Sequence, residues 1–197
     1  PDVEITYHSF ELDPDAPDDF EGTGDEYLAR RKGIDAATVQ AMHGRVVEAG
    51  AAAGLAYDFG RLVPTRTVHA HELTHHAKAL GLQRPMLERL FASHFCEGRH
   101  VGREDVLVEL AAEVGLEPDA TRAALRSGMY RDAVRADIAQ AAAYGIRGVP
   151  FYVLDGRCGL SGAQPPDVFT AALRQVASER SNVPDVPTGH TAANEPG

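Results

Sequence analysis

Apolar residues recur with two different periods along the chain. The opening stretch PDVEITYHSFEL has an apolar side chain at about every second position with one slip, which predicts a strand. The period then lengthens to that of amphipathic helices, with Gly or Pro at most of the joints. The predicted helices run over residues 25–31, 35–54, 68–80, 85–97, 103–114, 118–126 and 130–144.

The longest early helix shows how its ends and its buried face are predicted. Asp35 stands where an N-cap belongs, and Gly54 is placed to end the helix. The residues predicted to form its core-facing side are Val39, Met42, Val46 and Ala49.

Strands return only after the helical block. PFYVLDGRCGLSG contains two short runs of strand formers around Asp155-Gly156, a pair that favours a tight hairpin turn. A last helix is predicted over residues 166–178, and the polar, proline-rich tail over 181–197 is predicted to be disordered. The hairpin and the first strand can share one sheet only if the helical block is an insertion.

Composition narrows the classes of function. The 197 residues include 29 acidic and 19 basic side chains, a net charge of −10 that offers no cationic face to a nucleic acid. No apolar run approaches the roughly 18 residues of a membrane span. Cys96 and Cys158 are far apart and have no metal-type spacing. We expect a soluble protein without nucleic-acid or membrane partners.

A proline stands directly before the first of these later strands, in GIRGVPFYVLDG. The tertiary amide of an X-Pro bond lowers the cost of the cis form to about 0.5–1 kcal/mol, so Val149-Pro150 is a candidate cis bond. A trans Pro150 that simply begins a strand is the alternative.

The order of motifs resembles the DsbA-like thioredoxin family, in particular its FrnE-type branch. The resemblance covers about residues 1–177 and rests on YHSFELDPDAP, EAGAAAGLAYDF, AHELTHHAKALG, LFASHFCEGRHVGREDVLVELAAEVGL and GIRGVPFYVLDGRCGLSGAQP. It implies an α/β thioredoxin fold with a large all-helical insertion domain. The implied parts are a thioredoxin-fold strand and loop over 1–34, the helical insertion over 35–132, the C-terminal half of the thioredoxin fold over 133–180, and a tail over 181–197.

The resemblance also implies an enzyme, a protein thiol-disulfide oxidoreductase or isomerase. Val149 and Pro150 would form its substrate loop, where an extended peptide or glutathione pairs with the exposed backbone and Gly148 keeps the approach open. The family's reactive C-x-x-C begins the first helix, and we expect it, with the strand before it, just upstream of residue 1. Neither Cys96 nor Cys158 is expected to replace it.

Other candidate substrate-binding residues lie elsewhere in the chain. Arg66 is in a PTRT stretch similar to a Pro-x-Asn-Thr turn of glutathione-using relatives, and could bind a ligand carboxylate. His71 belongs to an alanine-histidine-x-leucine helix that in the family packs beside the cleft. Ser161, Gly162 and Gln164 precede the last helix, where capping and anion binding by free N–H groups are both open.

Three other functions are weighed against this one. A glutathione-dependent isomerase or transferase has the same fold, as in 2-hydroxychromene-2-carboxylate isomerase and kappa glutathione transferase, with serine in place of the first cysteine. The stretch from His71 to His75, with Glu72, matches the H-E-x-x-H of zinc metallopeptidases, although no third histidine follows at metzincin spacing. A peptide-binding module without catalysis is the interpretation if no nucleophile exists.

We therefore expect no metal site and no cofactor, with glutathione as a substrate at most. The expected partners are protein or peptide thiols and disulfides, or glutathione, and a homodimer is compatible with the family. The resemblance implies a cytoplasmic location.

Overall fold

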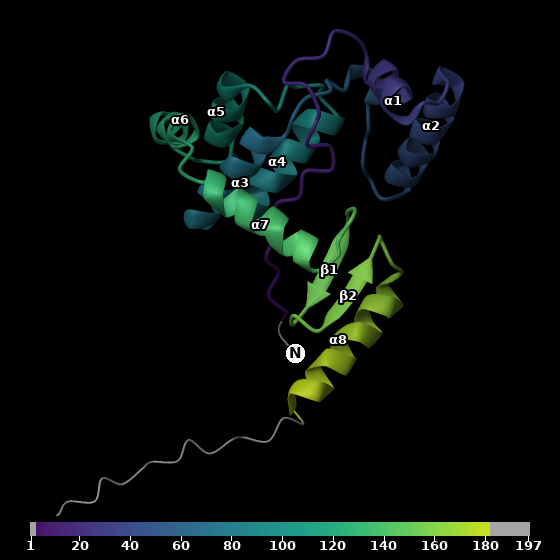
Figure 1. Cartoon of the computed structure of the whole chain (residues 1–197), viewed down its shortest axis with the longest axis vertical. Coiled ribbons are helices and arrows are strands. Elements are labelled where there is room, and N and C mark those ends of the chain that lie inside the picture. Colours follow the sequence, from purple (N-terminus) through teal and green to yellow (C-terminus); the bar gives the residue numbers. More distant parts are fainter. Residues whose placement is uncertain (1–2, 182–197) are drawn as a thin grey trace, which may run out of the picture. The chain divides into compact units, whose positions relative to one another are not determined.

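A computed structural model of the chain describes residues 3–181 (Figure 1). Backbone packing divides these residues into two compact units. The helical unit comprises Ile5–Gly145, and the hairpin unit comprises residues 3–4 together with 146–181. The helical unit is wider at both ends than the predicted insertion over 35–132, because residues 5–34 and the last helix of the block pack with the other helices.

The helical unit has seven α-helices and one short 3₁₀ helix among the described residues. They are α1 (Gly24–Lys32), α2 (Ala36–Ala52), η1 (Phe59–Arg61), α3 (Val68–Ala79), α4 (Gln83–Phe95), α5 (Glu104–Glu113), α6 (Pro118–Ser127) and α7 (Arg131–Ala143). Each α-helix was predicted from the sequence, with ends that differ by at most two residues. The 3₁₀ turn of η1 lies between two of the predicted helices and was not predicted.

Local capping explains why the predicted ends are close to the observed ones. The Asp35 carboxylate accepts a hydrogen bond of 2.7 Å from the N–H of Thr38, so α2 begins where predicted. Pro118 occupies the first turn of α6, and Glu117 caps it. Gly128 has a left-handed φ of 64° and ends the same helix.

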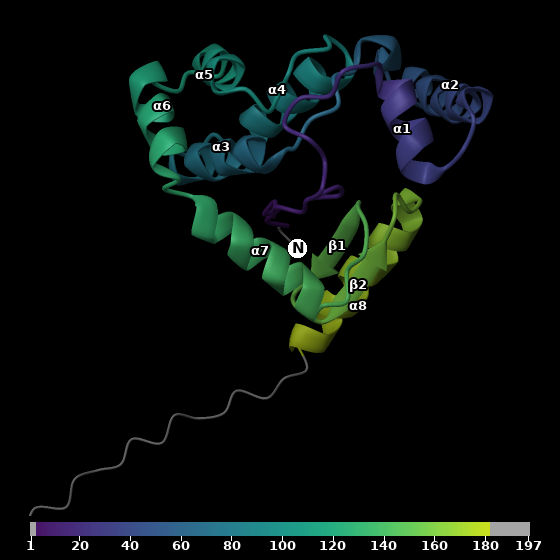
Figure 2. The same ribbon diagram turned by 45° about the horizontal axis from the view of Figure 1, so that its top comes forward.

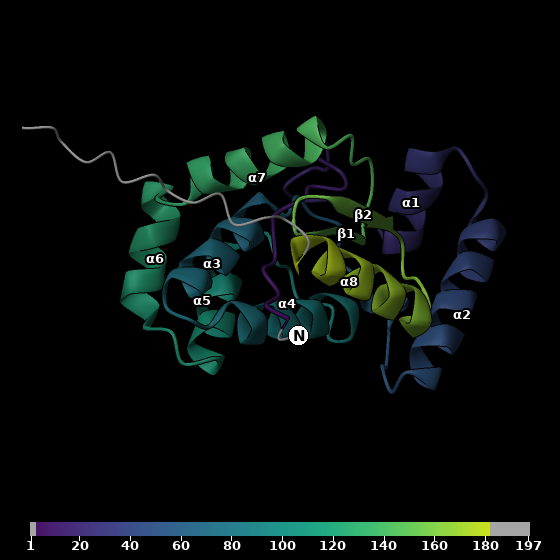
Figure 3. The same cartoon turned by 90° about the horizontal axis from the view of Figure 1, so that it is seen from below.

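The core of the helical unit forms around α3, which packs on α4, α5, α6 and α7 (Figure 3). Residues 72–77 of α3 are all buried, although five of the six are Glu, Thr, His or Ala. The fully buried apolar side chains of this core are Leu73, Ala77, Met86, Leu107, Leu110 and Ala111. Burial of each Leu or Met side chain of this set stabilises the unit by about 1.5–3 kcal/mol.

The predicted buried face of α2 is correct for only half of its residues. Val39 is fully buried and Met42 is partly buried, but Val46 is 45% exposed and Ala49 is exposed. α2 packs on α1 (Figure 2), and its C-terminal part meets the Tyr57 ring at Gly50. Because these partners cover a narrow strip of α2, the rest of its apolar side stays exposed.

The strand predicted at the start of the chain is not formed among residues 3–181. The segment is extended but unpaired, and its apolar side chains Val3, Ile5 and Leu12 are 54%, 68% and 67% exposed. Alternating residues favour an extended backbone, but a strand also requires a hydrogen-bonded neighbour. Within the helical unit the segment is held by side chains instead, for example by Gln83 Nε2 donating to the Tyr7 carbonyl at 3.0 Å.

The hairpin unit consists of β1 (Phe151–Leu154), β2 (Cys158–Ser161) and α8 (Pro166–Ser181). The strands are antiparallel, with Phe151 opposite Ser161 and Leu154 opposite Cys158. Asp155 and Gly156 have φ values of 53° and 66°, as a tight primed turn requires, which confirms the predicted hairpin.

Helix α8 packs on β1 within the hairpin unit. The ring of Tyr152 lies edge-on to Phe169 with centroids 4.7 Å apart, and Val176 is buried. The predicted disordered tail over 181–197 lies, apart from the backbone of Ser181, outside the described residues. None of the helices in residues 3–181 combines the length and the apolar character needed to cross a membrane.

Candidate functional site

The loop from Ile146 to Pro150 leads into β1 and presents its backbone to solvent. Val149 is 51% exposed, and the Val149–Pro150 peptide bond is cis. Within residues 3–181, neither the N–H nor the C=O of Val149 has a hydrogen-bond partner. A Cβ added at Gly148 would meet nothing within 4 Å, so the approach to this backbone is open.

The far side of the loop is fixed to the end of the hairpin. The Pro150 carbonyl accepts a hydrogen bond of 2.8 Å from the N–H of Gly162. Gly162 has a φ of 81°, and its own carbonyl accepts from the N–H of Gln164 at 3.1 Å. The Gln164 side chain donates to the Ser161 carbonyl at 2.6 Å. This arrangement makes residues 161–164 a support for the loop.

Six of the predicted site residues are therefore brought together in the hairpin unit, where β1 begins and β2 ends. They are Gly148, Val149, Pro150, Ser161, Gly162 and Gln164. The connected hydrogen bonds assign Gly162 and Gln164 to positioning of the loop, and leave the backbone N–H and C=O of Val149 without a partner among residues 3–181.

Arg66 and His71 belong to the helical unit, and each has partners there. Arg66 Nε donates to Glu11 Oε1 at 3.3 Å, and its backbone N–H donates to the Pro17 carbonyl at 3.0 Å. His71 is partly buried on α3; burial lowers its pKa, opposed by the negative charge of Glu11. Their predicted contacts with substrate stay predictions.

A polar cluster that the sequence analysis missed lies between the N-terminal segment and two helices of the helical unit. Ser9 Oγ lies 3.1 Å and Asp137 Oδ2 3.0 Å from His75 Nε2, and the Ser9 N–H donates to Asp137 Oδ2 at 2.7 Å. His8 Nδ1 lies 2.7 Å from Asp137 Oδ1. Asp137 follows the buried Val134 by three residues on α7, a spacing that could have indicated its burial.

Electrostatics keeps the carboxylate of this cluster ionised. Burial by itself raises the pKa of Asp137, but the Ser9 N–H and the nearby His8 outweigh burial, so the pKa lies below its usual value. Ser9 and Asp137 both approach the same nitrogen of His75, whereas a catalytic triad needs the serine and the carboxylate on different nitrogens. The cluster is therefore a structural clamp.

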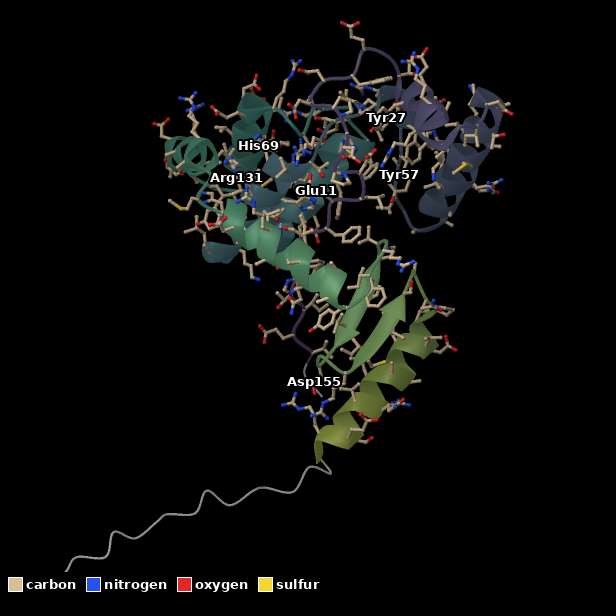
Figure 4. The ribbon with its side chains drawn as sticks, in the orientation of Figure 1. Glu11, Tyr27, Tyr57, His69, Arg131 and Asp155 are labelled. Atoms are coloured by element: carbon tan, nitrogen blue, oxygen red, sulfur yellow. The ribbon has the colours of Figure 1, made fainter. Side chains whose placement is uncertain are left out.

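The H-E-x-x-H stretch takes part in packing in this fold. Glu72 is 1% exposed, with Oε1 3.4 Å from Arg131 Nε and 3.9 Å from His69 Nδ1, and Figure 4 labels both basic residues. His75 is engaged by Ser9 as described above. The described part of the chain has no group of three or more His, Cys, Asp or Glu side chains arranged to hold a metal ion. This geometry does not support the zinc-peptidase hypothesis.

The two cysteines are free thiols in different units. Cys96 caps the end of α4 in the helical unit, and Cys158 begins β2 in the hairpin unit. Both are partly buried, and neither belongs to a C-x-x-C sequence.

Comparisons with known proteins agree with this architecture. A probable DsbA oxidoreductase from Streptomyces coelicolor has a crystal structure that matches with a TM-score of 0.87 and 36% sequence identity, over 99% of this chain and 86% of that one. The uncharacterized protein YwbO of Bacillus subtilis is 28% identical over 177 residues, which are 87% of this chain and 82% of the relative. The family model of the DSBA-like thioredoxin domain matches residues 1–174. This match spans most of the sequence, and the chain therefore belongs to the DSBA-like thioredoxin domain family.

Proposed function

We propose that the protein catalyses thiol-disulfide exchange in polypeptides, as an oxidoreductase or isomerase. The observation that carries this proposal is the exposed Val149, whose N–H and C=O have no partner among residues 3–181. An extended substrate segment can pair with these two groups as an added strand. Membership in the DSBA-like family supports exchange chemistry at such a loop.

The exchange needs a pair of thiols next to the bound strand. In the oxidising direction, a substrate thiolate attacks one sulfur of an oxidised C-x-x-C and releases the other as a thiolate. A second substrate thiolate then attacks the mixed disulfide. Two electrons pass from the two substrate thiols to the pair, and their two protons go to solvent. Run backwards, the same steps reduce a substrate disulfide and oxidise the pair. In isomerisation, one thiolate of the reduced pair attacks a substrate disulfide and releases a substrate thiolate. A different substrate thiolate then attacks the mixed disulfide, so a new substrate disulfide forms and the pair leaves in its reduced form.

The proposal requires a C-x-x-C outside residues 1–197, because Cys96 and Cys158 are not spaced as such a pair. The position we propose is the start of a helix upstream of residue 1, where the helix dipole lowers the pKa of the attacking thiol. Assignment to the FrnE-type branch and a cytoplasmic location belong to the same proposal, and the order of the motifs in residues 1–177 supports them.

A thiol count and an intact mass on the protein from its natural source test this requirement. Four thiols after reduction and denaturation, with a mass above 21.1 kDa, are expected: Cys96, Cys158 and the reactive pair. Fewer thiols at a higher mass would favour the glutathione-dependent isomerase or transferase. Two thiols at 21.1 kDa would overturn the exchange proposal.

Strand addition at Val149 is tested with cysteine peptides methylated at one backbone nitrogen at a time. Methylation at the nitrogen that donates to the Val149 carbonyl should raise KM about fivefold, the equivalent of one hydrogen bond of about 1 kcal/mol. Methylation of the next residue is the control, because its N–H points away from the partner strand. Equal effects at both positions would contradict pairing with Val149.

A further inference from the structure

Arg147 is the one charged residue of the loop that carries Val149. Its side chain is exposed and, among the residues that the structure describes, has neither an ion pair nor a hydrogen bond. Two other arginines of the hairpin unit have ion-pair partners: Arg157 Nε lies 3.5 Å and Arg180 NH1 3.7 Å from the Asp155 carboxylate, which Figure 4 labels at the hairpin turn. Arg147 is therefore free to bind an anion from outside.

The position of Arg147 places that charge beside the free backbone. It precedes Val149 by two residues, so their Cα atoms are at most about 7 Å apart. The long arginine side chain reaches a similar distance further. A strand paired with Val149 therefore passes within reach of the guanidinium, with the closest side chain about two residues from the one opposite Val149.

We propose that Arg147 selects polypeptide substrates that carry a carboxylate side chain two residues from the residue paired with Val149. The proposal rests on the proposed function, because it assumes strand addition at Val149. An arginine binds a carboxylate through two parallel N–H groups, which gives both affinity and a fixed register. Arg147 is thus a specificity residue that chooses aspartate or glutamate at one position of the substrate.

The net charge of the protein would produce the opposite preference, so the two effects can be told apart. With a net charge of −10, the protein as a whole repels acidic peptides and attracts basic ones at low salt. Long-range charge alone would favour lysine at every peptide position. A preference for glutamate confined to one position requires a local group that attracts anions, and the substitutions below test whether that group is Arg147.

Binding of cysteine-free peptides tests the proposal without requiring exchange chemistry. Fluorescent peptides with serine in place of cysteine would carry Glu, Gln or Lys at one position at a time, and Kd would be measured by anisotropy on the full-length protein. The Glu peptide should bind about threefold to tenfold more tightly than the Gln peptide at one position only, as for an exposed but well-oriented ion pair. This preference should weaken as salt is raised toward about 0.5 M.

Two substitutions identify the cation. Arg147→Gln should abolish the preference for Glu, and Arg147→Glu should reverse it toward Lys. Arg174→Gln is the matched control, because Arg174 is an exposed arginine on α8 without an ion pair among residues 3–181. It removes the same charge from the same unit and should leave the preference unchanged. Unaltered thermal melting would show that all three variants are folded.

The outcomes separate this proposal from the proposed function. If Arg147→Gln leaves the Kd of the Glu and Gln peptides in their original ratio, the specificity role is overturned, even where exchange with cysteine peptides proceeds. If the Glu preference depends on Arg147 but cysteine peptides are not exchanged, the specificity role of Arg147 is supported and the proposed enzymatic function is contradicted. Equal losses in Arg147→Gln and Arg174→Gln would assign the effect to net charge and overturn the proposal.

Discussion

The backbone N–H of Ser9 donates a hydrogen bond of 2.7 Å to the carboxylate of Asp137, 128 residues later in the chain. Since His75 and His8 contact the same carboxylate, Asp137 fastens the N-terminal segment of the helical unit to α3 and α7. The segment has no strand partner among the described residues, so this clamp carries much of its attachment within that unit.

Removal of the Asp137 carboxylate should therefore destabilise the helical unit. Asp137→Ala leaves the buried Ser9 N–H without an acceptor, and we expect a loss of about 2 kcal/mol in the free energy of unfolding, measured in urea. Asp132→Ala on the same helix is the control: its carboxylate is 95% exposed and contacts only Arg135 among the described residues. A control loss as large as that of Asp137→Ala would show that the clamp contributes little.

Acid should destabilise the helical unit through protonation of His94. Burial, with a smaller effect from His100, lowers the pKa of His94 from 6.5 to about 4. The unfolded chain then binds a proton that the folded chain does not, so stability falls as pH decreases from about 6.5 to 4. At about 1.4 kcal/mol for each pKa unit, the loss from this group is at most about 3.5 kcal/mol.

The variant His94→Phe isolates this effect, because it keeps a ring against Phe95, whose centroid lies 4.7 Å away, and removes the titration. Urea unfolding at several pH values should give a shallower slope between pH 4 and 6.5 for the variant than for the original protein. Identical slopes would mean that His94 is protonated equally in both states.

Helices and the hairpin could be predicted because their signals are local. The cap at Asp35, the turn at Asp155-Gly156 and the 3.6-residue spacing each depend on neighbours within a few positions. The strand over residues 3–12 was predicted from spacing alone, and it is wrong for the described residues because pairing depends on a distant partner. The exposed Val46 on α2 is a similar case, since only the partner helix decides how wide a face is buried.

The same difference between local and distant signals applies to the candidate site. Gly148, Val149 and Pro150 stand together in the sequence, so the loop could be identified before its geometry was known. The Ser9 and Asp137 clamp could not, because its polar residues come from segments more than 100 residues apart and carry no shared motif. The free Arg147 was also missed, since only the structure shows which arginines have partners.

Two glycines with nearly the same φ should respond very differently to alanine. Gly33 and Gly98 have φ values of 65° and 68°. Alanine at either position would be strained in this left-handed conformation, which lowers the free energy of unfolding by about 1 kcal/mol. A Cβ at Gly33 would meet nothing within 4 Å, whereas one at Gly98 would collide with the carbonyl oxygen of Arg61. We expect Gly98→Ala to lose at least about 3 kcal/mol and Gly33→Ala about 1 kcal/mol. Equal losses in urea unfolding would contradict the close backbone contact.

Cys96 and Cys158 should be dispensable for thiol-disulfide exchange. The proposed reaction uses a C-x-x-C pair outside residues 1–197, and Cys96 and Cys158 are partly buried thiols in separate units. The double variant Cys96→Ser, Cys158→Ser, made in the full natural chain, should therefore keep kcat/KM within about twofold for oxidation of a dithiol peptide, because no bond to either sulfur forms or breaks.

The single variants Cys96→Ser and Cys158→Ser show whether a loss of exchange comes from the chemistry or from a loss of folding. Serine in place of a partly buried cysteine adds a hydroxyl that must find a hydrogen bond, so a modest fall in melting temperature is expected for each. A loss of exchange of a hundredfold or more in Cys96→Ser or Cys158→Ser, with the fold intact by circular dichroism, would place that thiol in the reaction. The exchange would then have to be assigned to a cysteine within the 197 residues, and the requirement for an external C-x-x-C would fall.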